Sequence, residues 1–397
     1  MQKALKGMAP SEIVNLVRSA NLMGRGGAGF PTGLKWSIVP SGPEAPYPKY
    51  LICNADEMEP GTFKDRYLLE GNPHQLIAGM IIAAFAIQAD KAYIFLRWAY
   101  KKAEVIIRDA IAEAYKEGYL GKNILGTGFN LDLYLHTSAG RYICGEESAL
   151  MNSLEGKRAI PRAKPPYPAT SGLFGKPTVI NNVETLSWIS HIVENGADWF
   201  KGLSISGEGG TKLYGVSGRV KKPGLWELPL GTSMREIIEE HAGGMMDGYK
   251  LRAVIPGGAS TDFVMENNLD VRMDYASLSA ISSRLGTGTM ILLDDRTCPV
   301  AFIHNIEKFF ALESCGWCTP CREGLPWVEK VLLAIEEGRG KLEDLDILQH
   351  HTVYLAPGNT FCAHAPGAME PLQSGLRFFH DDFVRHIEEK RCPWRPS

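Results

Sequence analysis

Apolar positions recur along the first half of the chain with two spacings, one typical of helices and one typical of strands. Between residues 11 and 21, Ile13, Val14, Leu16 and Val17 repeat at helical spacing. Residues 131–137 alternate as a half-buried strand does. Similar patterns predict further helices over 76–87, 101–117 and 146–156, and strands over 50–53 and 92–96. Because strands alternate with helices, we expect a mostly parallel α/β sheet.

The pattern changes near residue 206. Two strand patterns, a helix over 233–245 and two more strands predict a small α+β module. After Cys298 the strand signals stop, and the remaining segments have helical periodicity. We therefore predict a multidomain α/β chain with boundaries at 1–205, 206–297 and 298–397.

Composition narrows the class of protein without changing this picture. The 397 residues are 45% hydrophobic, with 42 Lys and Arg against 45 Asp and Glu. Such a balance gives no reason to expect nucleic acid or an anionic membrane as a partner. The longest apolar run, 76–87, has 12 residues, whereas a bilayer span needs about 20. The N-terminal segment has no apolar signal region, so an intracellular protein with reduced cysteines is the default expectation.

The eight cysteines fall into two groups. Three of them form the pattern CxxCxxC, and a fourth follows after a gap of 40 residues. Such a set suits a 4Fe-4S cluster; zinc is the less favoured alternative, with His364 as the one feature that helps it. These four are Cys315, Cys318, Cys321 and Cys362. The others stand alone and are expected to be small buried apolar groups: Cys53, Cys144, Cys298 and Cys392.

A glycine-rich stretch, MGRGGAGFPTGLKW, contains the spacing GxGxxG at Gly24, Gly26 and Gly29. A dinucleotide fingerprint must follow a strand and open a helix, whereas the residues before this stretch have helical periodicity. The dehydrogenase interpretation is therefore weak. The absent side chains would let backbone amides approach a phosphate or a flat ring, with Arg25 and Lys35 adding positive charge. A tight packing loop explains the stretch equally well.

Polar residues follow the predicted strand at residue 50. Asn54, Asp56, Glu57 and Glu59 come at its carboxyl end, where open α/β sheets bind ligands. They suit ribose hydroxyls or the polar edge of a flavin or nicotinamide ring, although a turn with solvated acids would be the better interpretation of an isolated match.

Two more segments carry candidate polar groups. Glu146 and Glu147 stand near a helix start, where acidic residues are also common without a ligand. Lys164, Tyr167, Asn181 and Asn182 come from a Pro-rich loop over 160–177 and the helix start beyond it. We predict that Asn181 with Glu184 caps that helix.

The two kinds of site suggest an electron-transfer protein. A nucleotide-sized α/β site would hold nicotinamide, which delivers two electrons as hydride, whereas an iron-sulfur cluster accepts one at a time. A converter is needed between them, and flavin is the usual one. No Ser-His-Asp or Cys-His set supports hydrolytic catalysis.

Five long motifs, in this order, carry a family resemblance: GRGGAGFPTGLKW, CNADEMEPGTFKDRYLLEGNPH, YICGEESALMNSLEGKR, KPPYPATSGLFGKPTVINNVETL and ESCGWCTPCREGLPW. The chain resembles the NADH-binding flavoprotein subunit of respiratory complex I, in its bacterial form. This resemblance implies a Rossmann-like FMN- and NADH-binding domain, a ubiquitin-like middle domain of the SLBB (β-grasp) type, and a helical bundle that holds a 4Fe-4S cluster.

The resemblance also implies roles for single residues. Around FMN it places Gly24, Arg25, Gly26, Gly27, Gly29, Lys35, Asn54, Asp56, and Asn181 or Asn182. Toward NADH and the exposed side of the flavin it places Glu57, Glu59, Tyr142, Gly145, Glu146, Glu147 and Lys164, with Phe30 and Tyr167 stacking on the adenine. Cluster ligands would be Cys315, Cys318, Cys321 and Cys362. Ile38 stands where some relatives have an aromatic residue, and Tyr167 where Phe is frequent.

The implied activity is that of a NADH:quinone oxidoreductase, in which hydride passes from NADH to FMN and electrons then pass singly to the cluster. Implied partners are a thioredoxin-like 2Fe-2S subunit and a large multi-cluster iron-sulfur subunit, with the whole assembly peripheral on the inner face of the plasma membrane. Two alternatives stay open: a diaphorase subunit of an NAD-linked hydrogenase or formate dehydrogenase, and a non-catalytic scaffold with a structural metal.

Overall fold

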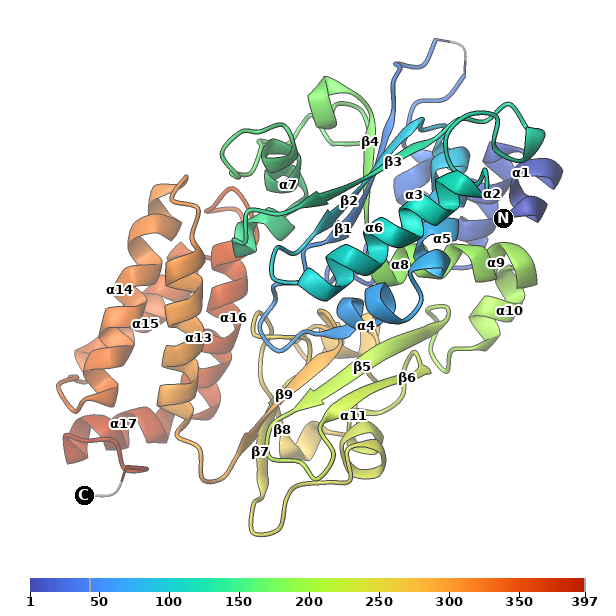
Figure 1. Cartoon of the computed structure of the whole chain (residues 1–397). Coiled ribbons are helices and arrows are strands. Elements are labelled where there is room, and N and C mark those ends of the chain that lie inside the picture. The colour runs from blue at the N-terminus through green and yellow to red at the C-terminus, as the bar shows by residue number, and fades with distance from the viewer. Residues whose placement is uncertain (43, 396–397) are drawn as a thin grey trace. The chain divides into compact units, whose positions relative to one another are not determined.

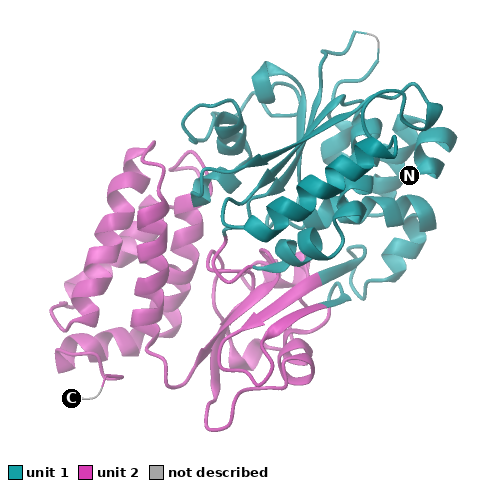
Figure 2. Cartoon of the chain, in the orientation of Figure 1, with its two compact units in different colours: residues 1–58, 63–212, 227–231 teal, residues 59–62, 213–226, 232–397 magenta. Residues whose placement is uncertain are grey.

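The computed structural model describes residues 1–42 and 44–395, which form two compact units (Figure 2). The first unit comprises residues 1–58, 63–212 and 227–231, and the second comprises 59–62, 213–226 and 232–397. The chain therefore passes from one unit to the other five times, after residues 58, 62, 212, 226 and 231. The structure divides into two compact units. The predicted division into three domains, with boundaries at residues 205 and 297, stays a prediction.

A four-stranded parallel sheet forms the centre of the first unit (Figure 1). The strand order is β3-β2-β1-β4. Mostly buried residues fill the inner strands β1 and β2 because both faces of the sheet are covered. This arrangement confirms the predicted parallel α/β sheet. The strands are β1 (Tyr50–Ala55), β2 (Lys91–Leu96), β3 (Asp132–Thr137) and β4 (Thr178–Asn182).

Helix α5 (Pro73–Ile87) lies at the centre of the apolar core. Ten of its 15 residues are buried, so the apolar run predicted as a buried helix is one. Gly79 lets α8 (Val183–Ser187) approach closely, because a Cβ atom there would lie 1.9 Å from the carbonyl oxygen of Leu186. The other helices of this unit are α1 (Gln2–Gly7), α2 (Pro10–Ser19), α3 (Thr32–Ser37), α4 (Lys64–Gly71), α6 (Lys101–Lys116), α7 (Glu147–Leu154), α9 (Ile189–Asn195) and α10 (Ala197–Gly202), with short turns η1 (Ile124–Gly126), η2 (Tyr142–Gly145) and η3 (Leu173–Gly175).

The predicted capping pair at the start of α8 is wrong by one residue. Asn181 still belongs to β4, and the Asn182 side chain accepts the hydrogen bond from the Glu184 amide. The single helix expected there is divided into α8, α9 and α10. Gly196, with φ of +92°, separates the last two because a helix does not continue through that conformation.

The second sheet has the strand order β6-β5-β9-β7-β8. β5 pairs with β9 in parallel, and β7 is antiparallel to both β8 and β9. The helix predicted over 233–245 is shorter than expected and changes to a π-helix, ending before Gly243 and Gly244, which both have φ of +73°. The elements are β5 (Thr211–Ser217), β6 (Gly224–Pro229), α11 (Met234–Glu236), η4 (Ile237–His241), β7 (Leu251–Ile255), β8 (Val264–Met265), η5 (Glu266–Asn268), α12 (Tyr275–Ala280) and β9 (Thr289–Asp294).

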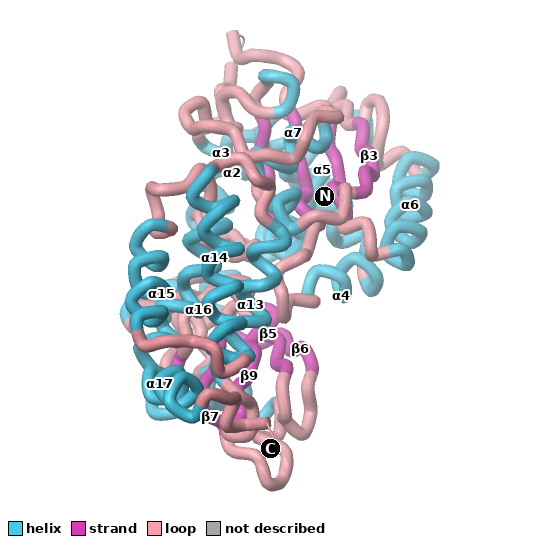
Figure 3. Tube along the Cα trace, turned by 90° about the vertical axis from the view of Figure 1, so that its left-hand side faces the viewer, coloured by secondary structure: helices cyan, strands magenta, loops and turns pink. Residues whose placement is uncertain are grey.

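Five helices follow among the described residues, so the helical region predicted after Cys298 is confirmed, although no periodic segment had predicted α15. α13 packs against α14 and α16, and α15 packs against α16 (Figures 1 and 3). Their bounds are α13 (Pro299–Glu313), α14 (Thr319–Glu336), α15 (Glu343–Tyr354), α16 (His364–Phe378) and α17 (His380–Glu389). Among the described residues, no helix combines the length and the apolar character that crossing a bilayer requires.

Candidate functional site

The glycine-rich loop connects α2 to α3, so a helix precedes it where a dinucleotide fingerprint needs a strand. The amide of Gly24 donates to the carbonyl of Phe30 at 2.9 Å and closes the loop. Gly27 and Gly29 have φ of +130° and +66°, a region that side chains with a Cβ atom disfavour. The doubt about a dehydrogenase fingerprint is therefore confirmed, and the backbone conformation favours glycine at positions 27 and 29.

The turn of this loop, residues 26–29, lies against the end of β4. A Cβ atom on Gly26 would come within 3.1 Å of the Cβ atom of Asn182. Within the described part of the chain, the backbone amides of residues 26–29 make no hydrogen bond to residues outside this turn. A turn whose amides are not used by other segments fits a phosphate group.

Arg25 uses its polar groups within the first unit. Its amide donates to Thr185 Oγ1 at 2.8 Å, and its buried guanidinium donates from Nη2 to the carbonyl of Gly209 at 2.7 Å. The structure thus places the guanidinium at the segment that leads into β5. The backbone of Arg25 is part of the glycine loop, whereas its guanidinium lies at Gly209, outside the loop.

Amide and carboxylate side chains meet at the carboxyl ends of the parallel strands. Asn54 on β1 and Asn182 on β4 are register partners. Asn54 Nδ2 donates to the carbonyl of Gly145 at 2.8 Å, which joins β1 to the turn before α7. Asp56 Oδ1 accepts from Ser138 Oγ, also at 2.8 Å. Asp56 and Ser138 are both buried, so the orientation of this carboxylate is fixed by the chain.

Asn181 is held from another direction. Trp36 Nε1, on α3, donates to Asn181 Oδ1 at 2.9 Å, and both residues are buried. The helix that follows the glycine loop is thereby tied to the end of β4. Sequence reasoning found both asparagines and did not find Trp36.

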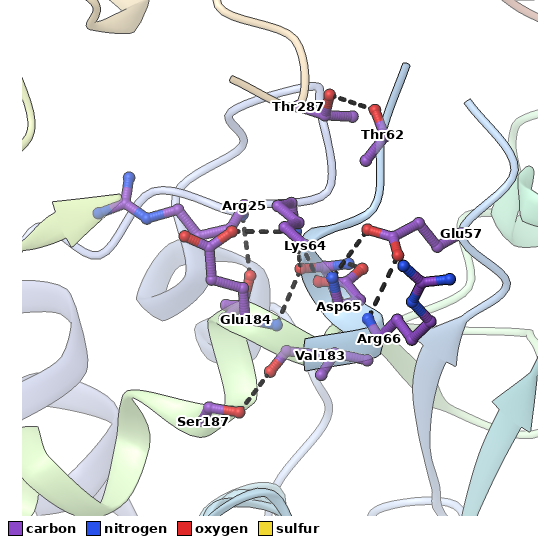
Figure 4. Close-up of polar contacts among 12 residues, drawn as sticks. Arg25, Glu57, Thr62, Lys64, Asp65, Arg66, Val183, Glu184, Ser187 and Thr287 are labelled. Carbon is purple, nitrogen blue, oxygen red and sulfur yellow. Dashed lines mark hydrogen bonds and ion pairs between the residues drawn. The ribbon is translucent and has the colours of Figure 1, made fainter. Parts of the chain in front are cut away.

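A buried network of charges lies beneath this sheet edge (Figure 4). Lys64 Nζ is 2.6 Å from Asp65 Oδ1, 2.9 Å from Glu184 Oε2 and 3.2 Å from Asn182 Oδ1. Lys212 Nζ contacts the same Glu184 oxygen at 2.7 Å. Asn182 Nδ2 in turn donates to Asp65 Oδ2 at 2.7 Å. The network therefore fixes which way the Asn182 amide faces.

The pKa values of these groups follow from burial and from their neighbours. Burial alone would raise the pKa of Glu184, but Lys212 and Lys64 outweigh it and lower that pKa to about 2. Burial lowers the pKa of Lys212 to about 7, with Glu184 opposing the shift. Burial would also lower the pKa of Lys64, yet the carboxylates around it raise that pKa. Lys64 and Glu184 are therefore both charged at neutral pH.

The Glu57 carboxylate forms hydrogen bonds with other groups of the protein. Its carboxylate accepts from the amides of Asp65 and Arg66, at 2.8 and 3.3 Å, and from the hydroxyl of Tyr100 at 2.7 Å. It thus binds the first turn of α4. Burial, followed by the nearby Asp65 carboxylate, raises the pKa of Glu57 to about 7. The side chain expected to contact NADH is fully engaged in the structure.

Glu59 belongs to the second unit. Its Oε1 accepts from the amide of Ser260 at 2.7 Å, and Gly258 leaves room for the side chain, since a Cβ atom there would lie 2.5 Å from Glu59 Cγ. The carboxylate is therefore oriented by the loop after β7.

A line of alternating charges joins three elements of the first unit. Glu147, the first residue of α7, lies 2.5 Å from Lys164 Nζ and 3.6 Å from Lys35 Nζ. Burial would raise the pKa of Glu147, but Lys35 and Lys164 lower it. Lys35 Nζ also lies 5.9 Å from the centre of the Phe30 ring. Phe30 and Tyr167 are exposed by 45% and 59%, so both rings are accessible to a stacking partner.

Two neighbouring candidates have local structural roles. Glu146 caps α7 by accepting from the amides of Ser148 and Ala149. Tyr142, half-buried, begins the short turn η2 directly before it.

Arg162, which sequence reasoning did not find, fixes the Pro-rich loop. Its guanidinium contacts Asn152 Oδ1 at 2.9 Å, the carbonyl of Gly172 at 2.9 Å and Glu155 Oε1 at 2.7 Å. Lys164 is two residues away in the same loop, and its ammonium contacts Glu147 and Glu146. Only the position of Arg162 in the long loop could have suggested it.

Three of the four cluster cysteines lie at helix starts in the second unit, and Cys315 lies two residues after the end of α13. Cys318 is the N-cap of α14, Cys321 is its third residue, and Cys362 comes two residues before α16. The rings of Trp317 and Phe361 are 6.2 Å apart, which brings the two cysteine segments together. Helix N-termini favour negative charge. This donor set fits an anionic thiolate-bound cluster.

Burial raises the pKa of the Cys321 thiol to about 12, with Cys318 and Cys315 adding to the shift. Its sulfur lies 3.2 Å from Ser314 Oγ. A thiol with so high a pKa becomes a thiolate only when a metal replaces the proton.

Comparisons with known proteins agree with this geometry. Residues 17–191 match the Nuo51 FMN-binding domain, 213–264 the SLBB domain, and 301–386 the NADH-ubiquinone oxidoreductase-F iron-sulfur binding region. The chain is 57% identical to the F subunit of the NADH-quinone oxidoreductase of Escherichia coli (strain K12), over 98% of this chain and 87% of the relative. The chain belongs to this family of NADH-quinone oxidoreductase F subunits.

Another family member and one solved structure extend this comparison. The F subunit of the NADH-quinone oxidoreductase of Mycobacterium bovis is 45% identical over 100% of this chain and 89% of its own length. An NAD+-reducing [NiFe]-hydrogenase in the air-oxidized state matches with a TM-score of 0.85 and 38% identity, over 96% of this chain. This chain spans 63% of that hydrogenase chain. The expected family, fold class and pair of cofactor-binding regions are confirmed.

Proposed function

We propose that this chain is the electron-input subunit of a proton-translocating NADH:quinone oxidoreductase, oxidising NADH at a bound FMN. The observation that carries the proposal is the meeting of the glycine loop with the strand ends, where Gly26 lies against Asn182. Bound FMN would supply the conversion between hydride, which carries two electrons, and the single electrons that a 4Fe-4S cluster accepts.

The chain's contribution at FMN is to hold it in one orientation. The amides of residues 26–29 would bind its phosphate, and Lys35 would add positive charge. Three asparagine amides would face the flavin in directions that Gly145, Trp36 and the Lys64 network already fix. Groups that need no reorganisation on binding favour both affinity and correct alignment. These asparagines are Asn54, Asn181 and Asn182.

The chain's contribution at NADH is to position it beside the flavin. Exposed Phe30 and Tyr167 would stack on the adenine. Glu147, kept ionised by Lys35 and Lys164, would accept hydrogen bonds from ribose hydroxyls. Hydride transfer needs no general base, so proximity and orientation are what the residues supply.

Five further residues would complete the surroundings of NADH and the flavin. Glu57 would act by fixing the start of α4 and not by binding NADH itself, because its carboxylate is occupied by backbone amides. The other four would lie near NADH and the exposed side of the flavin: Glu59, Tyr142, Gly145 and Glu146.

For the onward steps, Cys315, Cys318, Cys321 and Cys362 would hold one 4Fe-4S cluster. A thioredoxin-like 2Fe-2S subunit and a large multi-cluster iron-sulfur subunit would be the partners, at the inner face of the bacterial plasma membrane. The relatives are named as subunits of a larger enzyme, which supports assembly with other chains.

Anaerobic purification of the full chain tests the proposal. We expect one FMN and four iron atoms per chain and reduction of ferricyanide by NADH. The Cys321→Ser variant should lose iron and keep FMN. Colourless protein that holds zinc and no iron would overturn the proposal, and it would favour the metal-stabilised scaffold.

A second candidate is the diaphorase subunit of an NAD-linked hydrogenase. It is favoured by the close structural match to the NAD+-reducing [NiFe]-hydrogenase, although the identity is 38% there against 57% for the Escherichia coli relative. Identification of the co-purifying chains decides between them. Hydrogenase subunits would select the diaphorase, and the 2Fe-2S and multi-cluster subunits would select complex I.

A further inference from the structure

A second group of metal-binding side chains lies in the helical region, away from the four cluster cysteines. Its members come from four separate segments, all are buried, and their nearest ligand atoms lie within 4.8 Å of one another. We call it the Cys2HisGlu group: Cys298, Glu336, His386 and Cys392.

The segments converge at one end of the bundle, near the C-terminus (Figure 1). Cys298 is the N-cap of α13, Glu336 is the last residue of α14, and His386 lies in α17, with Cys392 three residues beyond that helix. Cys321 lies 15 residues before Glu336 on α14, or about 22 Å at 1.5 Å per residue. The Cys2HisGlu group is therefore distinct from the cluster site.

Three of the six distances in the group, those among Cys298, Glu336 and His386, match the edges of a zinc tetrahedron, and the Cys392 sulfur lies within 4.8 Å of these atoms. Cys298 Sγ lies 3.3 Å from His386 Nε2 and 3.5 Å from Glu336 Oε2, and the latter two atoms are 3.2 Å apart. Bond lengths of about 2.3 Å to sulfur and about 2.0 Å to nitrogen and oxygen give edges of roughly 3.5, 3.5 and 3.3 Å. One ion would fit between these atoms with little movement.

Neighbouring groups orient the ligand atoms. His386 Nδ1 lies 2.6 Å from the carbonyl of Asp382, which places the ring proton on Nδ1 and leaves the Nε2 lone pair facing the group. Arg395 Nη2 lies 2.9 Å from Glu336 Oε1, so Oε2 is the oxygen left for a metal. Such outer partners are a regular feature of metal-binding histidines and carboxylates.

Charge also favours a dication here. With two thiolates, one carboxylate and Zn²⁺ the group would carry a net charge of −1, which Arg395 balances. Two soft sulfur ligands with imidazole and carboxylate select zinc over magnesium or calcium.

We propose that the Cys2HisGlu group binds one Zn²⁺ in a closed structural site. Four protein ligands leave no open position for a substrate. The ion would fasten α17 and the segment after it to the start of α13 and the end of α14. This site is independent of the FMN and iron-sulfur chemistry proposed above.

Metal analysis of the full chain, purified without chelators, tests this. We expect one zinc per chain in addition to iron. This zinc should remain bound after dialysis against EDTA under native conditions. X-ray absorption at the zinc edge should give two sulfur neighbours at about 2.3 Å and two nitrogen or oxygen neighbours at about 2.0 Å. Less than 0.2 zinc per chain, also after incubation with ZnCl2, would overturn the proposal, as would a shell of four sulfurs or of none.

Variants locate the ion. Cys298→Ser keeps a side chain that can cap α13, and His386→Gln keeps a polar side chain of similar length; each should lower zinc at least fivefold with FMN and iron retained. Cys321→Ser should lose iron and keep zinc. Cys53→Ser, at a buried cysteine of β1 outside the group, is the control and should keep both metals. Zinc that stays at wild-type content in Cys298→Ser and His386→Gln would refute the assignment. If both variants prove insoluble, the absorption spectrum of the wild-type protein decides.

Discussion

Replacing Lys64 with methionine tests the importance of the buried charge network. Methionine keeps much of the side-chain volume and removes the charge. Asp65 and Glu184 would each lose a cation that lies at 2.6 and 2.9 Å. Glu184 would keep Lys212 at 2.7 Å, and Asp65 would keep the hydrogen bond from Asn182.

The remaining partners set the size of the effect. Removing one member of a buried ion pair costs about 3–5 kcal/mol, because it leaves a buried charge without its partner. Since both carboxylates keep one partner, we expect the low end, about 3 kcal/mol. In a unit of about 200 residues this corresponds to a fall in Tm of about 6–12 °C. FMN retention should fall as well, because Asn182 loses one of the groups that orient it.

Thermal unfolding of the full chain, followed by circular dichroism and by release of FMN fluorescence, measures both effects. The matched control is Lys102→Met, which removes an exposed partner of Glu70 at 2.8 Å. Surface pairs of this kind contribute less than about 1 kcal/mol. A Lys64→Met protein that melts within 1 °C of the Lys102→Met protein and keeps its FMN would refute this account of the network.

Three further predictions concern packing, pH and specificity. Gly79→Ala should lower stability by about 1–3 kcal/mol, because the added carbon would meet the Leu186 carbonyl, whereas Gly71→Ala, with open space around it, should be neutral or stabilising in urea unfolding. The pKa of Glu57 is raised from 4.5 to about 7 in the folded protein. The stability that its protonation contributes is therefore fully present below pH 4.5 and is lost as the pH rises through 7. Wild-type protein should lose about 2–3 kcal/mol of unfolding free energy from this group between pH 5 and pH 8, and Glu57→Gln should remove that loss. Glu147→Gln should raise kcat/KM for NADPH relative to NADH, because the carboxylate repels a 2′-phosphate; an unchanged ratio would contradict the placement of Glu147 at the ribose.

Much of the fold is predictable from local patterns. The parallel sheet, the buried α5 and the terminal helices each follow from a periodicity contained within the segment itself. The cluster cysteines can be predicted from their spacing in the sequence, because three of them lie within seven residues, in the turn before α14 and in its first residues. These features need no knowledge of which distant segments meet.

The parts that sequence reasoning missed depend on distant partners. Lys64, Glu184 and Lys212 come from α4, α8 and the start of β5, and nothing near any of them signals an ion pair. The isolated positions of Cys298 and Cys392 predict buried, apolar surroundings. Both are buried, but the apolar surroundings are wrong, since they lie beside a carboxylate and an imidazole. A lone cysteine has no local feature that separates these two environments.

The five passages of the chain between its two units limit how this protein can be divided. A single cut after residue 212 would leave residues 227–231 of the first unit and 59–62 of the second on the wrong fragments. Neither unit can be expressed, exchanged or fused as one uninterrupted stretch of coding sequence. Gene fusions that extend such a chain must therefore add material at its ends or in exposed loops, and the flavin-binding and iron-sulfur parts are expected to be inherited together.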